Sequence, residues 1–325
     1  MWFLFTILTT LLWSLAELFY KKGAHEREPY AHLKISITVG VVMGIHAIYT
    51  LIFGDIGYDF KNLLIYLPVS LCYILSMTLS YFGMRFLEES ISDPIENTSG
   101  ALCSILCVIF LGESIAAGSW VAIAVIVIGI LGVGYLENKG STNRQLKLGK
   151  KLAIIAFAMP FCYAIIDAVG SFLDSYYLTF MDEETFEIVT PLVNVTEDTI
   201  ENVANTSYEL TFLIVAIVLF IFLKTKGVKF NLPVELRKNG NRTNVFVNQW
   251  EKIVAALCET AGQFTYVFAM SGKAEIAAPI ISSVAVFSVI LSRIFLKEKL
   301  TKKQYIFIGL VLVGIVALGI MNPDA

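Results

Sequence analysis

Five carboxylates lie within or close to apolar segments of this 325-residue chain, and they are the side chains best suited to chemistry. They are Glu17, Asp93, Glu96, Asp167 and Glu259. An acidic side chain at membrane depth is costly, and one that occurs there usually faces an aqueous cavity or a partner. Burial also disfavours the charged form of a carboxyl group. The pattern therefore indicates reversible binding of protons and cations.

A polar stripe surrounds two of these acids. Asp93, Glu96 and Asn97 share one helical face with Gly100 and Ser104, because residues three, four and seven positions apart lie one above the other. Asp93 alone would also suit a helix cap. The stripe, however, continues past the depth that a cap explains, and we interpret it as a substrate-contacting face.

Asp167 and Glu259 lie far from the ends of their apolar segments. Tyr163 precedes Asp167 by one helical turn, and Gln263 and Tyr266 follow Glu259 on the same helical face. No Lys or Arg lies at comparable depth in these segments. We interpret both acids as residues that couple transport to protons. A structural hydrogen bond to a neighbouring tyrosine is the alternative.

The composition indicates the elements that must position these residues. The chain is 57% hydrophobic and 16% charged, with a mean hydropathy of +0.73, outside the range of soluble globular proteins. Apolar runs of about 20 residues recur, the length of a membrane-spanning helix. We therefore expect an all-α membrane protein. Ten spans are expected, at about residues 2–20, 34–53, 62–84, 90–111, 118–136, 152–178, 208–223, 250–270, 275–296 and 303–321.

The chain contains an internal repeat. A shift of 185 residues lays 85–134 on 270–319 without a gap, and Pro94 falls on Pro279. Each proline removes one helix hydrogen bond, so the pair is expected to form hinges or static kinks.

Four aromatic residues also fall at aligned positions of the two halves, namely Trp13, Tyr81, Tyr163 and Tyr266. The face of an aromatic ring attracts cations. Facing a cavity, these rings would hold a substrate cation.

The loop charges predict the orientation. All but two of the 24 Lys and Arg residues, Lys61 and Lys273, fall on the side opposite the termini. By the positive-inside rule, both termini then face out. Because five spans per repeat is an odd number, the two repeats must be inverted. We expect a first repeat at 1–137, a cytoplasmic linker at 138–151 and a second repeat at 152–321. The second repeat would carry an outer loop at 179–207, expected to be solvated, and a cytoplasmic loop at 224–250.

The sequence resembles the drug/metabolite transporter superfamily, and most of all its ten-helix EamA-type transporters. The resemblance rests on the paired aromatics, the paired prolines and the Phe-Leu-x-Glu endings at 110–113 and 295–298. The first span, with Glu17 four residues before Lys21, is also similar to that of the small multidrug resistance proteins. This second resemblance implies that Glu17 binds protons and organic cations, whereas an interfacial ion pair with Lys21 is the alternative.

Together these features predict a secondary active transporter of a small organic cation or amino-group metabolite, coupled to protons by alternating access. The expected cavity is acidic and lacks Lys and Arg, which argues against phosphorylated substrates. A divalent metal transporter is one alternative, because clustered oxygens suit a hard cation. A non-transporting membrane sensor or enzyme is another, although no catalytic arrangement is present.

We expect no cofactor, no metal site and no nucleic-acid partner. The expected partners are the small-molecule substrate, protons and the lipid bilayer of the plasma membrane, with the protein a monomer or a homodimer. The expected substrate- and proton-binding residues are Trp13, Glu17, Tyr81, Asp93, Glu96, Asn97, Tyr163, Asp167, Glu259, Gln263, Tyr266 and Ser282.

Overall fold

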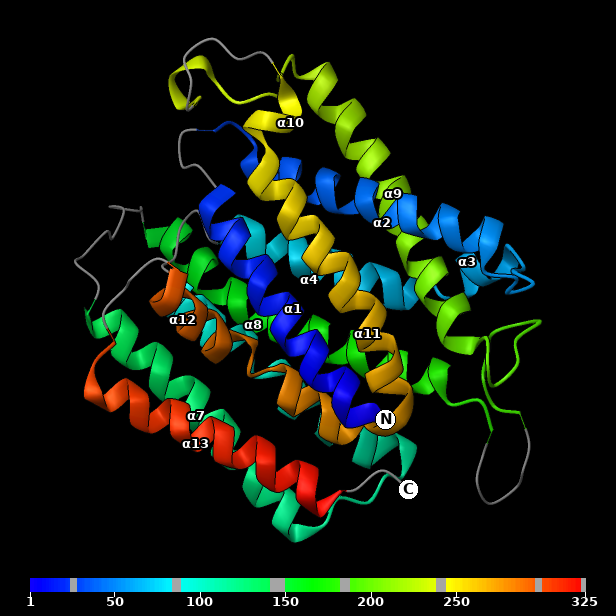
Figure 1. Ribbon diagram of the computed structural model, residues 1–325, viewed down its shortest axis with the longest axis vertical. Helices are drawn as coiled ribbons and strands as arrows, with labels where there is room; N and C mark the ends of the chain where they lie inside the picture. The colour runs from blue at the N-terminus through cyan, green and yellow to red at the C-terminus, as the bar shows by residue number, and fades with distance from the viewer. Residues whose placement is uncertain are drawn as a thin grey trace.

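The computed structural model describes residues 1–23, 28–83, 89–140, 150–181, 188–237, 244–295 and 300–322. Within these ranges the secondary structure is helical, apart from one isolated bridge between Met181 and Ile188 (Figure 1). In these described ranges, seven helical segments are long and apolar enough to cross a membrane. The expectation of an all-α architecture is therefore met in the described residues.

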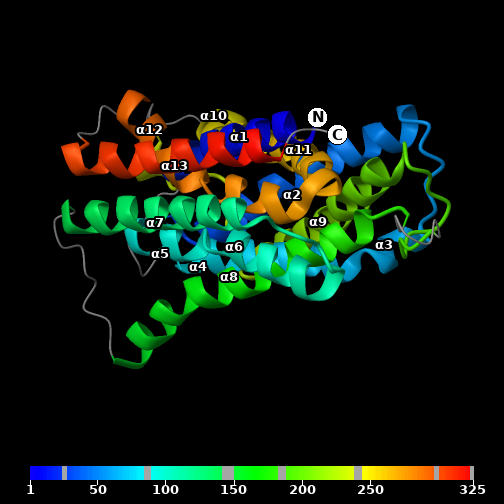
Figure 2. The same cartoon turned by 90° about the horizontal axis from the view of Figure 1, so that it is seen from below.

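The helices, in chain order, are α1 (Trp2–Gly23), α2 (Ala31–Phe53), α3 (Lys61–Ile65), α4 (Leu67–Gly83), α5 (Glu89–Glu96), α6 (Ser99–Leu106), η1 (Cys107–Leu111), α7 (Ala117–Gly140), α8 (Lys150–Leu178), α9 (Ile200–Thr225), η2 (Val234–Leu236), α10 (Val245–Asn248), α11 (Trp250–Ile281), α12 (Val284–Phe295) and α13 (Lys302–Met321). The beginning of α1 and the end of α13 lie at the same end of the bundle, here called the terminal end (Figures 1 and 2). The opposite end is called the loop end.

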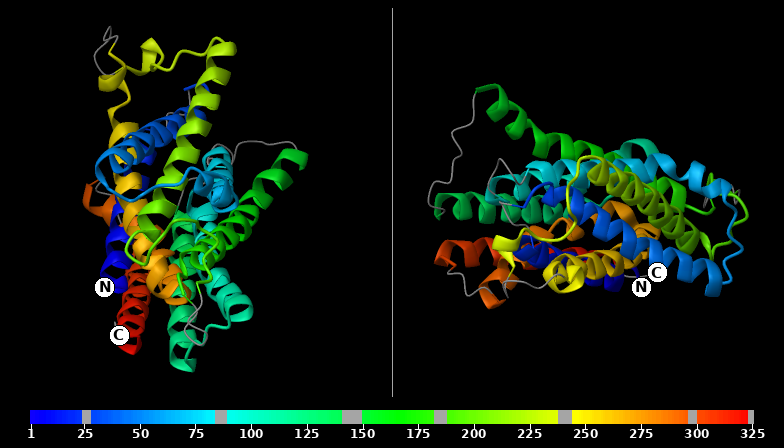
Figure 3. Two further views of the ribbon diagram at one scale, coloured as in Figure 1. Left: turned by 90° about the vertical axis from the view of Figure 1, so that its right-hand side faces the viewer. Right: turned by 90° about the horizontal axis from the view of Figure 1, so that it is seen from above.

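The helices pack in pairs. α1 lies along α11, α4 along α8, α2 along α9, and α7 along α13. Figure 3 shows the last two pairs from two further directions. α1 and α11 enclose one side of the bundle centre and α4 and α8 another, so residues from all four helices can meet there.

The polar outer connection ends earlier than the sequence suggests. We expected it to extend over 179–207, but α9 already begins at Ile200. Asn205, Thr206 and Ser207 are buried in its second turn, and Ser207 pairs with the Tyr58 hydroxyl at 2.8 Å. Their polarity resembled that of a solvated loop, whereas they pack against other parts of the chain.

The break that we expected between the spans 250–270 and 275–296 also lies at a different position in the structure. α11 continues from Trp250 to Ile281, and only Lys273 has non-helical backbone angles, with φ −146° and ψ 71°. The connection is therefore a kink within one long helix. The true interruption comes later, at Ser282 and Ser283.

Two helices are interrupted close to a proline. The break between α5 and α6 covers Asn97–Thr98, three residues after Pro94. The break between α11 and α12 covers Ser282–Ser283, three residues after Pro279. The two breaks lie 185 residues apart, the shift that superposes the repeated sequences.

The broken helices cross each other closely. The Gly100 N–H donates to the Ser282 Oγ at 3.1 Å, and the Ser104 hydroxyl donates to the Glu275 carbonyl at 2.6 Å. Pro279 has no N–H with which to satisfy that carbonyl, so Ser104 supplies the missing donor. A Cβ at position 100 would collide with the Ser282 Oγ. The crossing therefore requires glycine at position 100.

Candidate functional site

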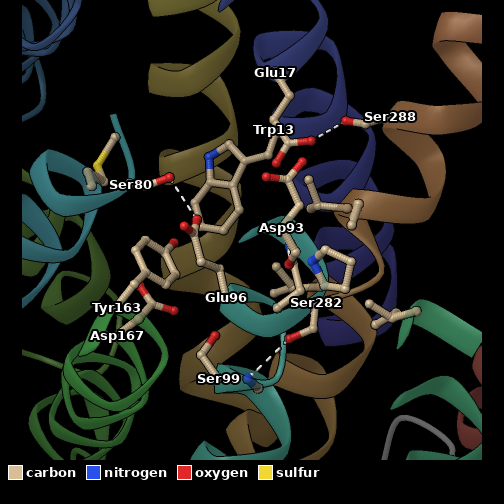
Figure 4. A pocket seen from close by; sticks show the side chains of 18 of the residues that line it. Trp13, Glu17, Ser80, Asp93, Glu96, Ser99, Tyr163, Asp167, Ser282 and Ser288 are labelled. Carbon is tan, nitrogen blue, oxygen red and sulfur yellow. Dashed lines mark hydrogen bonds between the residues drawn. The ribbon is translucent and has the colours of Figure 1, made fainter. Parts of the chain in front are cut away.

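A cavity of about 200 Å³ lies at the centre of the bundle, between α1, α4, α8, α11 and the broken helices (Figure 4). All five acids singled out from the sequence line it. Among the described residues that line it there is no Lys, Arg or His. The cavity thus combines acidic groups from separate helices in a space whose described lining contains no basic side chain.

The structure brings nearly all of the expected site residues together. Those that line the cavity are Trp13, Glu17, Asp93, Pro94, Glu96, Asn97, Tyr163, Asp167, Glu259, Gln263, Tyr266 and Ser282. Pro279 is buried in α11 next to the cavity-lining Ala278. The side chain of Tyr81 lies outside the described residues. Each assigned role remains a prediction, since position alone does not define it.

The part of the cavity nearest the loop end contains Glu17 and Asp93. Glu17 accepts a hydrogen bond from the Ser288 hydroxyl, which joins α1 to α12. Figure 4 shows the carboxylates of Glu17 and Asp93 pointing into the same part of the cavity. Two acids from helices distant in sequence therefore face one volume.

Glu96 and Asp167 both form hydrogen bonds with α4. Glu96 is buried and accepts a hydrogen bond from the Ser80 hydroxyl at 2.7 Å. Asp167 accepts one from the Ser76 hydroxyl at 3.3 Å. Ser76 and Ser80 are one helical turn apart, so α4 offers each acid a neutral donor. These serines were not among the expected residues, because serine is too common in apolar helices to stand out.

Glu259 belongs to the contact between α1 and α11. Its carboxylate is 3.5 Å from the Tyr20 hydroxyl, and its backbone carbonyl accepts from the Trp13 indole at 3.4 Å. Trp13 also stacks on Tyr266 with ring centroids 5.0 Å apart. The indole lies so close to Gly262 that a Cβ there would collide with it. An acid and a fixed aromatic pair thus share this wall.

Towards the terminal end the cavity closes on a group of hydroxyls. The Tyr73 and Tyr266 hydroxyls are 2.7 Å apart, and Tyr266 donates to the Ser171 hydroxyl at 2.9 Å. Beyond them, Asp174 is fully buried and accepts from Tyr66 and Tyr73. The sequence analysis did not single out Asp174. Its spacing of seven residues from Asp167, on the same face of α8, was the available signal.

A second buried acid was also missed. Glu209 is fully buried in α9, and its two carboxylate oxygens are 2.9 and 2.8 Å from the His46 Nδ1 on α2. Glu209 lies one residue inside the expected span 208–223, where an acid looks interfacial. The pair belongs to the α2–α9 contact and does not line the central cavity.

The cavity offers carboxylates, hydroxyls and ring faces to a ligand. These groups suit a cation that carries hydrogen-bond donors, and they suit protons. Among the described residues no three His, Cys, Asp or Glu side chains are grouped so that they could hold a metal ion. Dispersed acids therefore characterise this site.

Comparisons with known proteins agree with this architecture. A family model for the EamA-like transporter family matches residues 1–135 and 203–320. A solved structure described only as "Crystal structure of protein" is similar to this chain with a TM-score of 0.66. It is 12% identical, over 98% of this chain and 96% of its own. That likeness concerns the fold alone. No protein with a curated description matches.

The matched regions cover well over half of the chain and contain most of the helices that enclose the cavity. Together with the long apolar helices, they show an integral, multi-pass membrane protein. The chain belongs to the EamA-like transporter family.

Proposed function

We propose that the protein is a secondary transporter that exchanges a small organic cation or amino-group metabolite for protons. The observation that carries this proposal is the central cavity, with five carboxylates and no Lys, Arg or His among its described lining residues. An anionic substrate would meet only repulsion from such a wall. A cation would be attracted by the carboxylates and by the Trp13–Tyr266 ring pair.

Proton coupling follows from the same acids. Several carboxylates that converge in a low-dielectric space cannot all stay ionised unless a cation compensates them. Protons supply that compensation when no substrate is bound, and a bound cation displaces them. Substrate and proton then exclude each other through one site, and this competition is the requirement for exchange.

We also infer ten membrane spans in two inverted repeats, 1–137 and 152–321, joined by a linker at 138–151. The helix pairs support this reading. The repeat matches α1 with α8 and α4 with α11, so that the α1–α11 contact has its counterpart in the α8–α4 contact. The two helix breaks and the two regions of the family match point the same way. Two inverted halves around a central site are the usual basis of alternating access.

We place both termini outside the plasma membrane, on the basis of the loop charges. The test is cysteine labelling with an impermeant reagent in a background that lacks the five native cysteines. Gly140→Cys should be protected in intact cells, and Asp198→Cys should react. Labelling of position 140 from outside would reverse the orientation.

A divalent metal is the less favoured substrate. Such an ion takes six or more oxygen ligands at close range, whereas the described acids are spread around the cavity. The Trp13–Tyr266 ring pair also favours an organic cation over a metal ion as the ligand.

The decisive experiment uses purified protein in proteoliposomes that contain a pH-sensitive dye. Choline, putrescine, tetraethylammonium, basic amino acids, Mg²⁺, Mn²⁺ and anionic sugar phosphates are added in turn. We expect proton movement with one or more of the organic cations and none with the sugar phosphates. Proton movement driven only by anions or only by metal ions would contradict the proposal. Empty liposomes provide the control.

A further inference from the structure

Asp174 is a buried acid that the proposed exchange leaves unused, and it lies next to the cavity. It lies in α8, three residues beyond the cavity-lining Ser171 and four residues before the end of the helix at Leu178. Its exposed fraction is 0%. A buried carboxylate that served no purpose would be a cost to a membrane protein.

We propose that Asp174 is a second proton-binding site of the transporter, joined to the substrate cavity by Tyr73, Tyr266 and Ser171. This inference rests on the proposed proton coupling and names the group that exchanges the proton on the terminal side. Glu17, Asp93, Glu96, Asp167 and Glu259 would then bind the proton on the cavity side.

The hydroxyl groups form a continuous path. Asp174 is 3.3 Å from the Tyr73 hydroxyl, which is 2.7 Å from that of Tyr266. Tyr266 is 2.9 Å from Ser171, and Tyr73, Tyr266 and Ser171 all line the cavity. Each hydroxyl can donate one proton and accept another. A proton that leaves the Asp174 carboxyl group for the Tyr73 oxygen displaces the Tyr73 proton to Tyr266. Tyr266 in turn releases its own proton to Ser171 or directly to the cavity, so that one proton reaches the cavity.

The surroundings of Asp174 consist of other weak acids. Tyr66 and Tyr73 approach it from α3–α4, Tyr266 from α11 and Cys103 from α6. Asp167 is the acid that lies seven residues earlier on its own helix. Each of these titratable groups is a weak acid, and none of them is a base. A proton is therefore the cation that can balance this carboxylate.

Residues 188–199, in the connection before α9, are tied to the elements that flank Asp174. The Asn62 side chain forms two hydrogen bonds of 2.9 Å with the backbone of Val193. Thr190 donates to the Tyr177 carbonyl at 2.6 Å, and the Tyr66 and Tyr177 rings contact edge to face. This described segment, which the sequence suggested was only solvated, is thus held next to Tyr66 and the end of α8. Movement of this segment would open Asp174 to the solution at the terminal end, as the proposed alternating access requires.

The first test needs no substrate. Infrared difference spectra of the full-length protein in detergent, between about pH 5.5 and 8.5, should contain a protonated-carboxyl band that is absent in Asp174→Asn. The band should persist in Asp167→Asn. If no carboxyl band in this interval depends on Asp174, the residue does not exchange protons and the proposal is wrong.

The second test separates coupling from structure, with choline and putrescine as probes in proteoliposomes. Asp174→Asn should lose uptake driven by a pH gradient but keep the exchange of labelled for unlabelled probe. Tyr73→Phe removes one hydroxyl of the path and should also lose uptake driven by a pH gradient. Tyr66→Phe removes a bond to Asp174 outside the path and should keep coupling.

The outcomes distinguish this inference from the proposed function. Absence of substrate-dependent proton movement in the wild type would overturn proton coupling itself. Coupling that is intact in both Asp174→Asn and Tyr73→Phe would overturn only the role of Asp174. If Asp174→Asn does not fold and Tyr73→Phe couples normally, Asp174 is structural and the inference is also wrong.

Discussion

Two groups of buried charge in this protein are arranged in opposite ways. At the loop end, Glu28 accepts hydrogen bonds from Lys34 at 2.9 Å, from Lys252 at 2.7 Å and from Gln249 at 2.9 Å. All four side chains are nearly inaccessible. In the central cavity, by contrast, the acids face hydroxyls and ring faces, and the described lining contains no base.

The two groups differ in how the charge of their carboxylates is balanced. Burial alone would raise the pKa of Glu28, but the attraction of Lys252 and the hydrogen bonds from Lys252, Gln249 and Lys34 outweigh it and lower the pKa. Its charge is balanced permanently within the protein. This group joins the connection before α2 to the beginning of α11. The described lining around the cavity acids contains no base, and under the proposed function a cation that binds and leaves would balance them instead.

The largest expected effect concerns transport. Glu259→Gln and Asp167→Asn keep the shape and hydrogen-bonding capacity of the side chain but cannot exchange a proton. Uptake driven by a pH gradient should be abolished, and gel filtration should show that both variants remain folded. Unchanged proton-driven uptake in both would break the comparison, because the cavity acids would then be as structural as Glu28.

The next effect concerns stability. Glu28→Gln leaves two buried lysines without their carboxylate, and loss of one partner of a buried ion pair costs about 3–5 kcal/mol. Thermal unfolding in detergent should show a correspondingly lower midpoint. Glu235→Gln, which changes an acid in the connection between α9 and α11, is the matched control and should change little. Equal midpoints for the two variants would show that the lysine–glutamate group is not a structural tie.

A smaller effect is expected for cation binding. Glu96 is buried in the cavity wall, and its neutralisation removes one charge-assisted contact worth about 1–3 kcal/mol. Glu96→Gln should therefore weaken binding of choline or putrescine and flatten its pH dependence together. Isothermal titration at a series of pH values provides the measurement. A variant that keeps both affinity and pH slope would exclude Glu96 from the site.

The smallest expected effect concerns how the stability contribution of Glu28 depends on pH. Because the pKa of Glu28 is lowered from 4.5, its contribution to stability is complete above that value. The contribution is lost as the pH falls through the folded-state pKa. The difference in unfolding midpoint between wild type and Glu28→Gln should therefore be constant near neutrality and narrow below about pH 4.5. A difference that widens in acid would mean that the pKa is raised instead.

The sequence located the cavity acids well, for a physical reason. Charged residues in apolar segments are rare, so Glu17, Asp167 and Glu259 stand out by residue type and position alone. Asp174 and Glu209 did not, because each lies within a few residues of a predicted helix end. At such a position the sequence does not separate an interfacial acid from a buried one.

Contacts between residues that are distant in sequence could not be predicted, for a different reason. Glu28 and Lys252 are 224 positions apart, and no local pattern relates them. The beginning of α9 was misplaced because Asn205 and Thr206 are polar yet buried. In both cases tertiary contacts, rather than local composition, decide where a polar residue lies.

The crossing of the two broken helices also bears on how the chain is made. Both of its donors, the Gly100 N–H and the Ser104 hydroxyl, belong to residues synthesised long before their acceptors at Ser282 and Glu275. Chains are made from the N-terminus, and earlier parts fold first. The Glu275 carbonyl that Pro279 leaves without a backbone donor therefore receives the Ser104 hydroxyl only after α11 has been synthesised and lies against α6.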